Sequence, residues 1–276
     1  MREPNFIIIG GMNTGTTSLH KYLSYHDDIF MSNPKELDFF NQSKNYNKGV
    51  DFYKSYFNTT RKVAGECSPN YTKGNSDEVA ERIFRTLPNV KLIYIVRNPV
   101  DRFLSQCRFH NLDPDYLCND YFGDKEFPFD VMISGMYGLH YERFIKYFNK
   151  EQILVINHNS LLNERIDTMN LVFNFLKVEK KNYDFSKINF KEHNLKTKEL
   201  PSKFVVYLNK LTVYNFLKKH LNNDNFLKSA YHALMYSKPQ KKQFDEKLKP
   251  KVYNHFKNDI EKFELLTNMN FKDWKI

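Results

Sequence analysis

Long apolar runs are missing from this chain of 276 residues. A membrane-spanning helix needs about 20 consecutive, mostly apolar residues, and no stretch of the sequence approaches that length. The first apolar run, Phe6 to Ile9, is also too short for the core of a signal peptide. We therefore expect neither a membrane span nor a membrane partner.

Cysteine is also scarce. The three cysteines are Cys67, Cys107 and Cys118, and their positions match no metal-ligand spacing. An odd number of thiols argues against a disulfide framework and fits a reducing compartment. The sequence therefore predicts a cytoplasmic protein with free thiols and no metal site.

Positive charge and aromatic rings are abundant. The formal net charge is +10, aromatic residues make up 16% and hydrophobic residues 41% of the chain. This composition indicates a globular core and a preference for anionic partners such as nucleotides, phosphates, sulfated glycans, nucleic acid or acidic membranes. No nucleic-acid-reading motif accompanies the charge, so we expect no nucleic-acid partner.

Short apolar runs alternate with stretches of helical periodicity. Predicted strands are Phe6–Ile9, Val63–Gly65, Lys91–Val96 and Gln152–Ile156. Predicted helices begin near Thr16, around 52–57, at Asn75 or Ser76, and over 99–110, 137–148 and 169–176. Residues 111–134 are expected to form a long loop.

This order predicts an α/β fold, with a P-loop-like parallel sheet flanked by helices and a helical C-terminal region. We expect a single domain over 1–276, composed of a nucleotide-binding core over 1–200 and an appended helical region over 201–276.

The loop after the first predicted strand has the features of an anion site. It runs Gly10-Gly11-Met12-Asn13-Thr14-Gly15-Thr16-Thr17 and leads directly into a helix. Backbone N–H groups and the helix dipole favour a negative charge at such a place, and the hydroxyls of Thr14, Thr16 and Thr17 can add donors. The alternative is a tight strand-to-helix turn with a threonine cap.

Two positions argue against a nucleoside triphosphatase or a kinase. Thr16 stands where the phosphate-binding lysine of such enzymes belongs. Arg97 follows the strand 91–96, where an acidic residue would hold magnesium. The site is therefore predicted to bind an anion directly rather than through a metal.

Five segments, taken together, resemble a known family, the sulfotransferases that use 3′-phosphoadenosine 5′-phosphosulfate (PAPS), especially the carbohydrate branch. The segments are FIIIGGMNTGTTSL from Phe6, PKELDFF from Pro34, GECSPNY from Gly65, KLIYIVRNPVDRFLS from Lys91 and GMY from Gly135. They occur in the family's order and span roughly residues 5–200.

The resemblance implies a role for several residues. Residues 13–17, which are Asn13, Thr14, Gly15, Thr16 and Thr17, would bind the 5′-phosphosulfate, and Arg97 with Ser105 would bind the 3′-phosphate. The alternative for that last pair is a helix-capping interaction.

Glu36 would be the general base, with a pKa raised by burial beside Phe39 and Phe40. On its own, Glu36 would more often be a solvated carboxylate. Lys35 would offset charge on the sulfuryl oxygens or point to water.

The sequence departs from the family pattern at two positions. Asn13 replaces the usual lysine or arginine of the loop, and Cys67 replaces a lysine found in some glycan enzymes. Loss of the loop cation leaves three alternatives: another cation such as Lys35 substitutes, turnover is slow, or the protein binds the nucleotide without catalysis.

Three further residues have two interpretations each. His110 is either an acceptor-site residue or an ordinary packed or exposed histidine. Lys196 and Lys198 either close over the nucleotide or are surface lysines.

The functional expectation is transfer of a sulfuryl group from PAPS to a hydroxyl or amine of a small molecule or glycan, with PAP as product and no metal. The alternative is a non-catalytic protein that binds PAP or PAPS.

Overall fold

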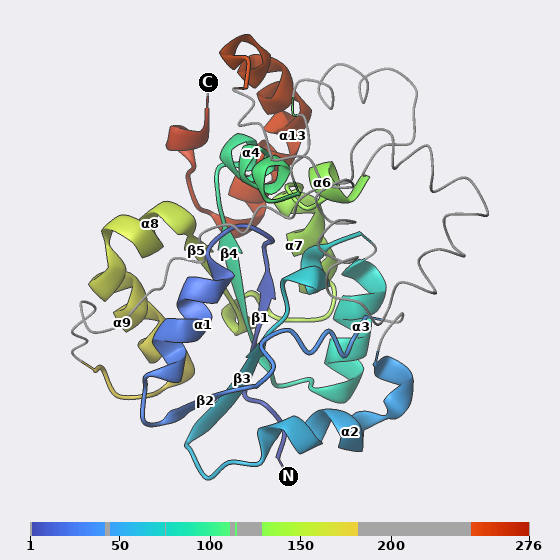
Figure 1. Cartoon of the computed structure of the whole chain (residues 1–276), viewed down its shortest axis with the longest axis vertical. Coiled ribbons are helices and arrows are strands. Elements are labelled where there is room, and N and C mark those ends of the chain that lie inside the picture. The colour runs from blue at the N-terminus through green and yellow to red at the C-terminus, as the bar shows by residue number, and fades with distance from the viewer. Residues whose placement is uncertain are drawn as a thin grey trace, which may run out of the picture.

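Five parallel strands form the centre of the structure, a computed structural model that describes residues 2–41, 45–74, 76–110, 114, 129–181 and 244–275. The strand order is β2-β3-β1-β4-β5, and every neighbouring pair is parallel (Figure 1). The strands are β1 Phe6–Gly10, β2 Ile29–Met31, β3 Val63–Cys67, β4 Lys91–Val96 and β5 Ile153–Asn157.

Helices cover both faces of this sheet (Figure 1). The helices are α1 Thr16–Ser24, α2 Val50–Lys54, α3 Ser76–Thr86, α4 Pro99–His110, α6 Phe129–Ile133, α7 Tyr137–Ile145, α8 His158–Asn163, α9 Arg165–Leu176 and α13 Lys249–Thr267. Short 3₁₀ turns are η1 Tyr46–Lys48, η2 Ser55–Phe57, η3 Pro69–Thr72, η4 Lys150–Gln152, η5 Glu246–Leu248 and η6 Lys272–Trp274. The predicted α/β class is therefore confirmed.

Each strand contributes to two separate hydrophobic cores, because successive side chains of a strand point to opposite faces. In β1, Phe6 and Ile8 pack with α1, α8 and α9, whereas Ile7 and Ile9 pack with α3, α4, α7 and α13. Burial on both faces explains why β1 reads as a continuous apolar run rather than an alternating one.

Most predicted elements are present, with shifted ends. The helix over 99–110 is found as predicted, α7 ends at Ile145 instead of 148, and α9 begins four residues earlier than predicted. The three-residue strand β2 was not predicted, since three residues show no periodicity. The predicted loop over 111–134 is wrong at its end, where α6 forms; most of that stretch lies outside the described residues.

The C-terminal helix α13 packs into the core of the sheet domain. Its residues Phe256, Ile260 and Phe263 belong to the same buried cluster as β1 and β4. Asp259, also in α13, accepts hydrogen bonds from the backbone N–H groups of Gly138 and Leu139, both 2.8 Å, at the N-terminus of α7. The boundary expected near residue 200 lies outside the described residues.

Within the described ranges, no helix is long and apolar enough to cross a membrane.

Candidate active site

The candidate residues gather at one edge of the sheet. The loop 10–15 follows β1, Ser68 follows β3, Arg97 follows β4 and His158 follows β5. All of these strands are parallel, so their carboxyl ends lie at the same edge. Open parallel sheets bind ligands at that edge, next to the strand where the chain reverses direction across the sheet.

The loop after β1 ends at an exposed helix N-terminus. Gly15 is the N-cap of α1 and adopts a left-handed backbone with φ 98°. In the described part of the chain no side chain caps the helix, and its first turn contains no acidic residue. Its N-terminal dipole is therefore available to an external anion.

Some side chains of this loop stabilise the loop itself, and others are available to donate hydrogen bonds to a ligand. Thr14 is buried, and its hydroxyl donates to the Gly11 carbonyl at 2.7 Å, so it braces the loop instead of donating to a ligand as expected. The amide nitrogen Nδ2 of Asn13 is buried and has no hydrogen-bond partner among the residues that the structure describes. A buried donor without a partner is costly, and an anion in the loop would satisfy it.

Arg97 lies directly beside this loop. Its guanidinium is 3.4 Å from the Asn13 carbonyl, and its backbone N–H donates to the Tyr137 hydroxyl at 3.2 Å. Burial lowers the pKa of Arg97, yet an arginine stays charged. Within the described part of the chain, no carboxylate forms an ion pair with it. Ser105 lies further along the adjoining helix α4 and is partly buried.

A second arginine of α4 is fully buried behind the loop. Arg102 donates to the side chain of Gln106 and to the Val131 carbonyl. Gln106 in turn contacts the Met12 sulfur at 3.4 Å. This buried cation adds positive potential near Arg97, and nothing in its sequence position predicted its burial.

His158 is a site residue that sequence reasoning missed. Its Nδ1 donates to the Thr14 carbonyl at 2.7 Å, which places the ring against the loop. Burial, and then the nearby Arg97, lower the pKa of His158. A Cβ at position 15 would lie 2.9 Å from Nδ1, so His158 and the backbone together require glycine there. The available signal was its position directly after a predicted strand.

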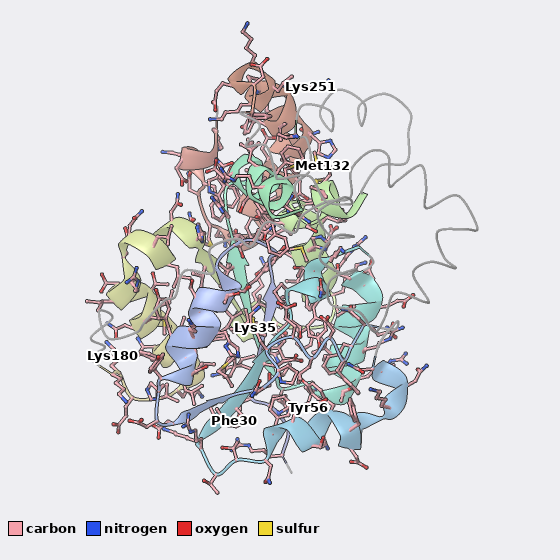
Figure 2. All side chains as sticks on the ribbon, viewed as in Figure 1. Phe30, Lys35, Tyr56, Met132, Lys180 and Lys251 are labelled. Carbon is pink, nitrogen blue, oxygen red and sulfur yellow. The ribbon has the colours of Figure 1, made fainter. Side chains whose placement is uncertain are left out.

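Glu36 occupies a different environment from the one expected. Its side chain is 47% exposed, and its carboxylate pairs with the Lys35 ammonium at 2.7 Å. Phe39 and Phe40 are buried in the core, but they do not enclose Glu36. The expected burial of Glu36 is therefore wrong, because these aromatic rings point into the sheet domain. Lys35 lies beside α1 (Figure 2), and its charge acts on His20 of that helix.

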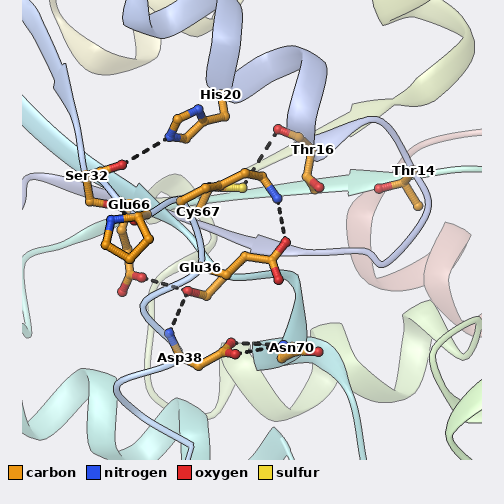
Figure 3. A network of polar contacts seen from close by, with 12 residues as sticks. Thr14, Thr16, His20, Ser32, Glu36, Asp38, Glu66, Cys67 and Asn70 are labelled. Atoms are coloured by element: carbon orange, nitrogen blue, oxygen red, sulfur yellow. Dashed lines mark hydrogen bonds and ion pairs between the residues drawn. The ribbon is translucent and has the colours of Figure 1, made fainter. Parts of the chain in front are cut away.

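The buried carboxylate of this region is Glu66, at the end of β3. It has no exposed surface, and desolvation raises its pKa to about 7. It accepts hydrogen bonds from the hydroxyls of Tyr53 at 2.7 Å, Ser68 at 2.7 Å and Tyr71 at 3.0 Å. Figure 3 shows Glu66 and Asp38 on one side of Glu36, and Thr14 and Thr16 of the loop on the other.

The remaining candidates are only partly described. His110 ends α4, but its side chain lies outside the described residues, as do Lys196 and Lys198. Across the described ranges, no group of three His, Cys, Asp or Glu residues could hold a metal ion.

Comparison with protein families decides the classification. The family model described as "Sulfotransferase domain" matches residues 3–275. The chain belongs to the sulfotransferase family.

Relatives of this sulfotransferase include much longer proteins. The bifunctional heparan sulfate N-deacetylase/N-sulfotransferase 1 of Xenopus tropicalis is 32% identical over 199 residues, which are 64% of this chain and 22% of that protein. The membrane-associated sulfotransferase kil1 of Dictyostelium discoideum is 41% identical over 111 residues, covering 38% and 23%. The chain thus spans about a fifth of the length of the curated relatives it matches.

Solved structures agree with the fold of this sulfotransferase. A sulfotransferase from Alicyclobacillus acidocaldarius superimposes with a TM-score of 0.65 at 19% identity, covering 99% of both chains. The sulfotransferase domain of the Synechococcus PCC 7002 olefin synthase gives a TM-score of 0.52 at 14% identity, covering 93% of this chain and 94% of that one. The predicted family and fold are confirmed.

Proposed function

We propose that this sulfotransferase moves a sulfuryl group from PAPS to a hydroxyl or amine of a small-molecule or glycan acceptor. The observation that carries the proposal is the loop after β1. There, among the described residues, no side chain caps the N-terminus of α1 and none pairs with the buried Asn13 amide, and a bound anion would satisfy both. Arg97, without an acidic partner among the described residues, lies next to the same loop.

PAPS carries two anionic groups, and the site offers a place for each. The loop 10–17 would hold the 5′-phosphosulfate through backbone N–H groups and Asn13. Arg97 would hold the 3′-phosphate with its planar fork of donors, assisted by the Ser105 hydroxyl. A nucleoside triphosphate suits the site less well, because Thr16 and Arg97 replace the lysine and the acid that such a ligand needs.

The reaction would be a direct in-line displacement. The acceptor oxygen or nitrogen forms a bond to sulfur while the bond from sulfur to the phosphate oxygen breaks and PAP leaves. The acceptor proton passes to the Glu36 carboxylate. For this, Glu36 must exchange its ion pair with Lys35 for a hydrogen bond to the acceptor. Lys35, once released, would offset the negative charge on the sulfuryl oxygens.

A second candidate function is PAP or PAPS binding without catalysis. Asn13 favours it, because an uncharged amide stabilises the leaving phosphate less than a lysine would. Both candidates bind PAP, and only the enzyme converts PAPS.

The deciding experiment measures two quantities on one preparation of the protein. PAP binding is measured by titration calorimetry, and PAP release from PAPS is followed with a panel of phenols, alcohols, amino sugars and glucosamine-containing oligosaccharides. We expect PAP binding together with acceptor-dependent PAP release. Tight PAP binding without release for any acceptor would establish the second candidate.

Two observations bear on the class of acceptor. The N-sulfotransferase relatives are named for heparan sulfate, which supports a glycan amine. The exposed position of Glu36 suits either a glycan or a small molecule. A cytoplasmic location and the absence of metal and nucleic-acid partners stay predictions.

A further inference from the structure

Two backbone N–H groups just after Glu36 are bound by side-chain hydroxyls from another part of the chain. The Asp38 N–H donates to the Ser68 hydroxyl at 3.1 Å, and the Phe40 N–H donates to the Tyr71 hydroxyl at 3.4 Å. The segment 36–40 contains no helix or strand, so these two N–H groups lack the partners that a helix or sheet would supply. Side chains from a distant part of the chain therefore hold the segment that carries Glu36.

Both hydroxyls converge on one carboxylate. Ser68 donates to Oε2 of Glu66 at 2.7 Å, and Tyr71 donates to Oε1 at 3.0 Å. When Glu66 is ionised, its carboxylate only accepts, and each hydroxyl hydrogen then points at Glu66. Each hydroxyl oxygen then accepts a hydrogen bond from an N–H group of the segment. The charge on Glu66 therefore sets which group donates and which accepts in each of these hydrogen bonds.

Tyr53 provides an internal comparison. Its hydroxyl also donates to Oε1 of Glu66, at 2.7 Å. Within the described part of the chain, no N–H of the Glu36 segment donates to that hydroxyl. Tyr53 and Tyr71 are thus two fully buried tyrosines on one carboxylate, and both rings pack against Phe40. Within the described residues, only the Tyr71 hydroxyl accepts a hydrogen bond from the segment, and a phenylalanine at position 53 would keep the ring contacts.

Asp38 holds the same segment a second time. Its backbone adopts φ 49°, and its carboxylate accepts from the Asn70 amide at 2.9 and 3.0 Å. Asn70 and Tyr71 both lie in η3, directly after Ser68. The position of Glu36 thus depends on the stretch 66–71, although these residues lie about 30 positions later in the chain.

We propose that Glu66, acting through the hydroxyls of Ser68 and Tyr71, is the positioning residue of the segment that carries Glu36. The inference rests on the proposed function insofar as Glu36 is the general base. Glu66 does not touch the substrates. It fixes the backbone from which Glu36 reaches the acceptor, so its loss should reduce turnover and leave nucleotide binding intact.

The test compares three variants of the full chain. Tyr71→Phe and Ser68→Ala each remove a hydroxyl that accepts a hydrogen bond from the segment, and Tyr53→Phe is the control that removes a hydroxyl without such a bond. Each substitution removes one hydroxyl that donates to Glu66. Three quantities are measured: kcat for PAP release from PAPS, the Kd of PAP, and the hydrogen-exchange rates of the Asp38 and Phe40 amides.

We expect Tyr71→Phe to speed exchange of the Phe40 amide and Ser68→Ala to speed exchange of the Asp38 amide. Both should lower kcat by about 10- to 100-fold through displacement of the base, with the Kd of PAP unchanged. Tyr53→Phe should leave kcat and both exchange rates near the values of the unmodified protein.

Two results would overturn the inference: a loss of kcat in Tyr53→Phe equal to that in Tyr71→Phe, or unchanged amide exchange in both Tyr71→Phe and Ser68→Ala. If the unmodified protein releases no PAP from PAPS, the proposed function fails instead. The exchange rates still decide whether Glu66 positions the segment.

Discussion

The two sides of the site are held by different means. On the nucleotide side, the loop 10–17 is held through its carbonyl groups, by the Thr14 hydroxyl from within and by the side chains of His158 and Arg97 from outside. On the acceptor side, the Glu36 segment takes its position from Glu66, Ser68 and Tyr71, which lie far away in the sequence.

This difference explains what a substitution should do on each side. Changes on the nucleotide side remove donors that face the anion, so they should act mainly on PAP affinity. Changes on the acceptor side displace the base, so they should act mainly on turnover. Glu36→Gln and Arg97→Ala test this division directly, and Asn13→Lys and Glu66→Gln test the chemistry and the stability of the two sides.

Glu36→Gln should have the largest effect. Loss of the general base should lower kcat for PAP release by about 100- to 10,000-fold, with the Kd of PAP unchanged. The control is Glu78→Gln, which changes a half-exposed carboxylate of α3. An equal loss of PAP affinity in Glu36→Gln would place Glu36 on the nucleotide side and break the comparison.

Arg97→Ala should raise the Kd of PAP by roughly 100-fold, because it removes charge-assisted hydrogen bonds to the phosphate. Arg97→Lys should recover only part of this loss, since lysine keeps the charge without the planar fork. Arg85→Ala, at a side chain 73% exposed, is the matched control for calorimetry. Unchanged PAP affinity in Arg97→Ala would remove this residue from the 3′-phosphate site.

Asn13→Lys should raise the rate of PAP release about 10-fold, because a cation would stabilise the charge developing on the leaving phosphate. If Lys35 already supplies part of that stabilisation, Lys35→Met should reduce the rate more in the unmodified protein than in the Asn13→Lys background. A double-mutant cycle measures this coupling. Equal effects in both backgrounds would show that Lys35 does not compensate for Asn13.

Glu66 should change a different quantity, the dependence of stability on pH. Its pKa rises from an ordinary 4.5 to about 7 on folding, so the folded state binds more protons between these values. Stability from Glu66 therefore falls as pH rises from about 4.5 to 7, by at most about 1.4 kcal/mol per pH unit.

His140 contributes the opposite trend. Burial lowers its pKa to about 4, so acid destabilises the fold through this residue between pH 6.5 and 4. The difference between the unmodified protein and Glu66→Gln, measured by urea unfolding from pH 5 to 8, isolates the Glu66 contribution. Parallel pH profiles would show that the protonation of Glu66 is the same in the folded and unfolded states over this range.

Much of the sheet could be predicted because its strands are buried on both faces. Continuous apolar runs over 6–9 and 91–96 identify β1 and β4 without any long-range information. β2 escaped prediction because its three residues are held by pairing with β3 and not by a pattern of their own. The early start of α9 escaped because Arg165 and Ile166 carry no apolar periodicity toward the core.

The sequence alone identified the loop 10–17 and the family, because the glycines and backbone N–H groups of such a loop are consecutive in the chain. The burial of Glu66, the exposure of Glu36 and the contact of His158 with the loop were decided only by the tertiary structure. Burial and the direction of a hydroxyl depend on which distant residues pack around a group. A local motif identifies Glu36 as the candidate base, but only the packing of 66–71 against 36–40 determines where its carboxylate lies.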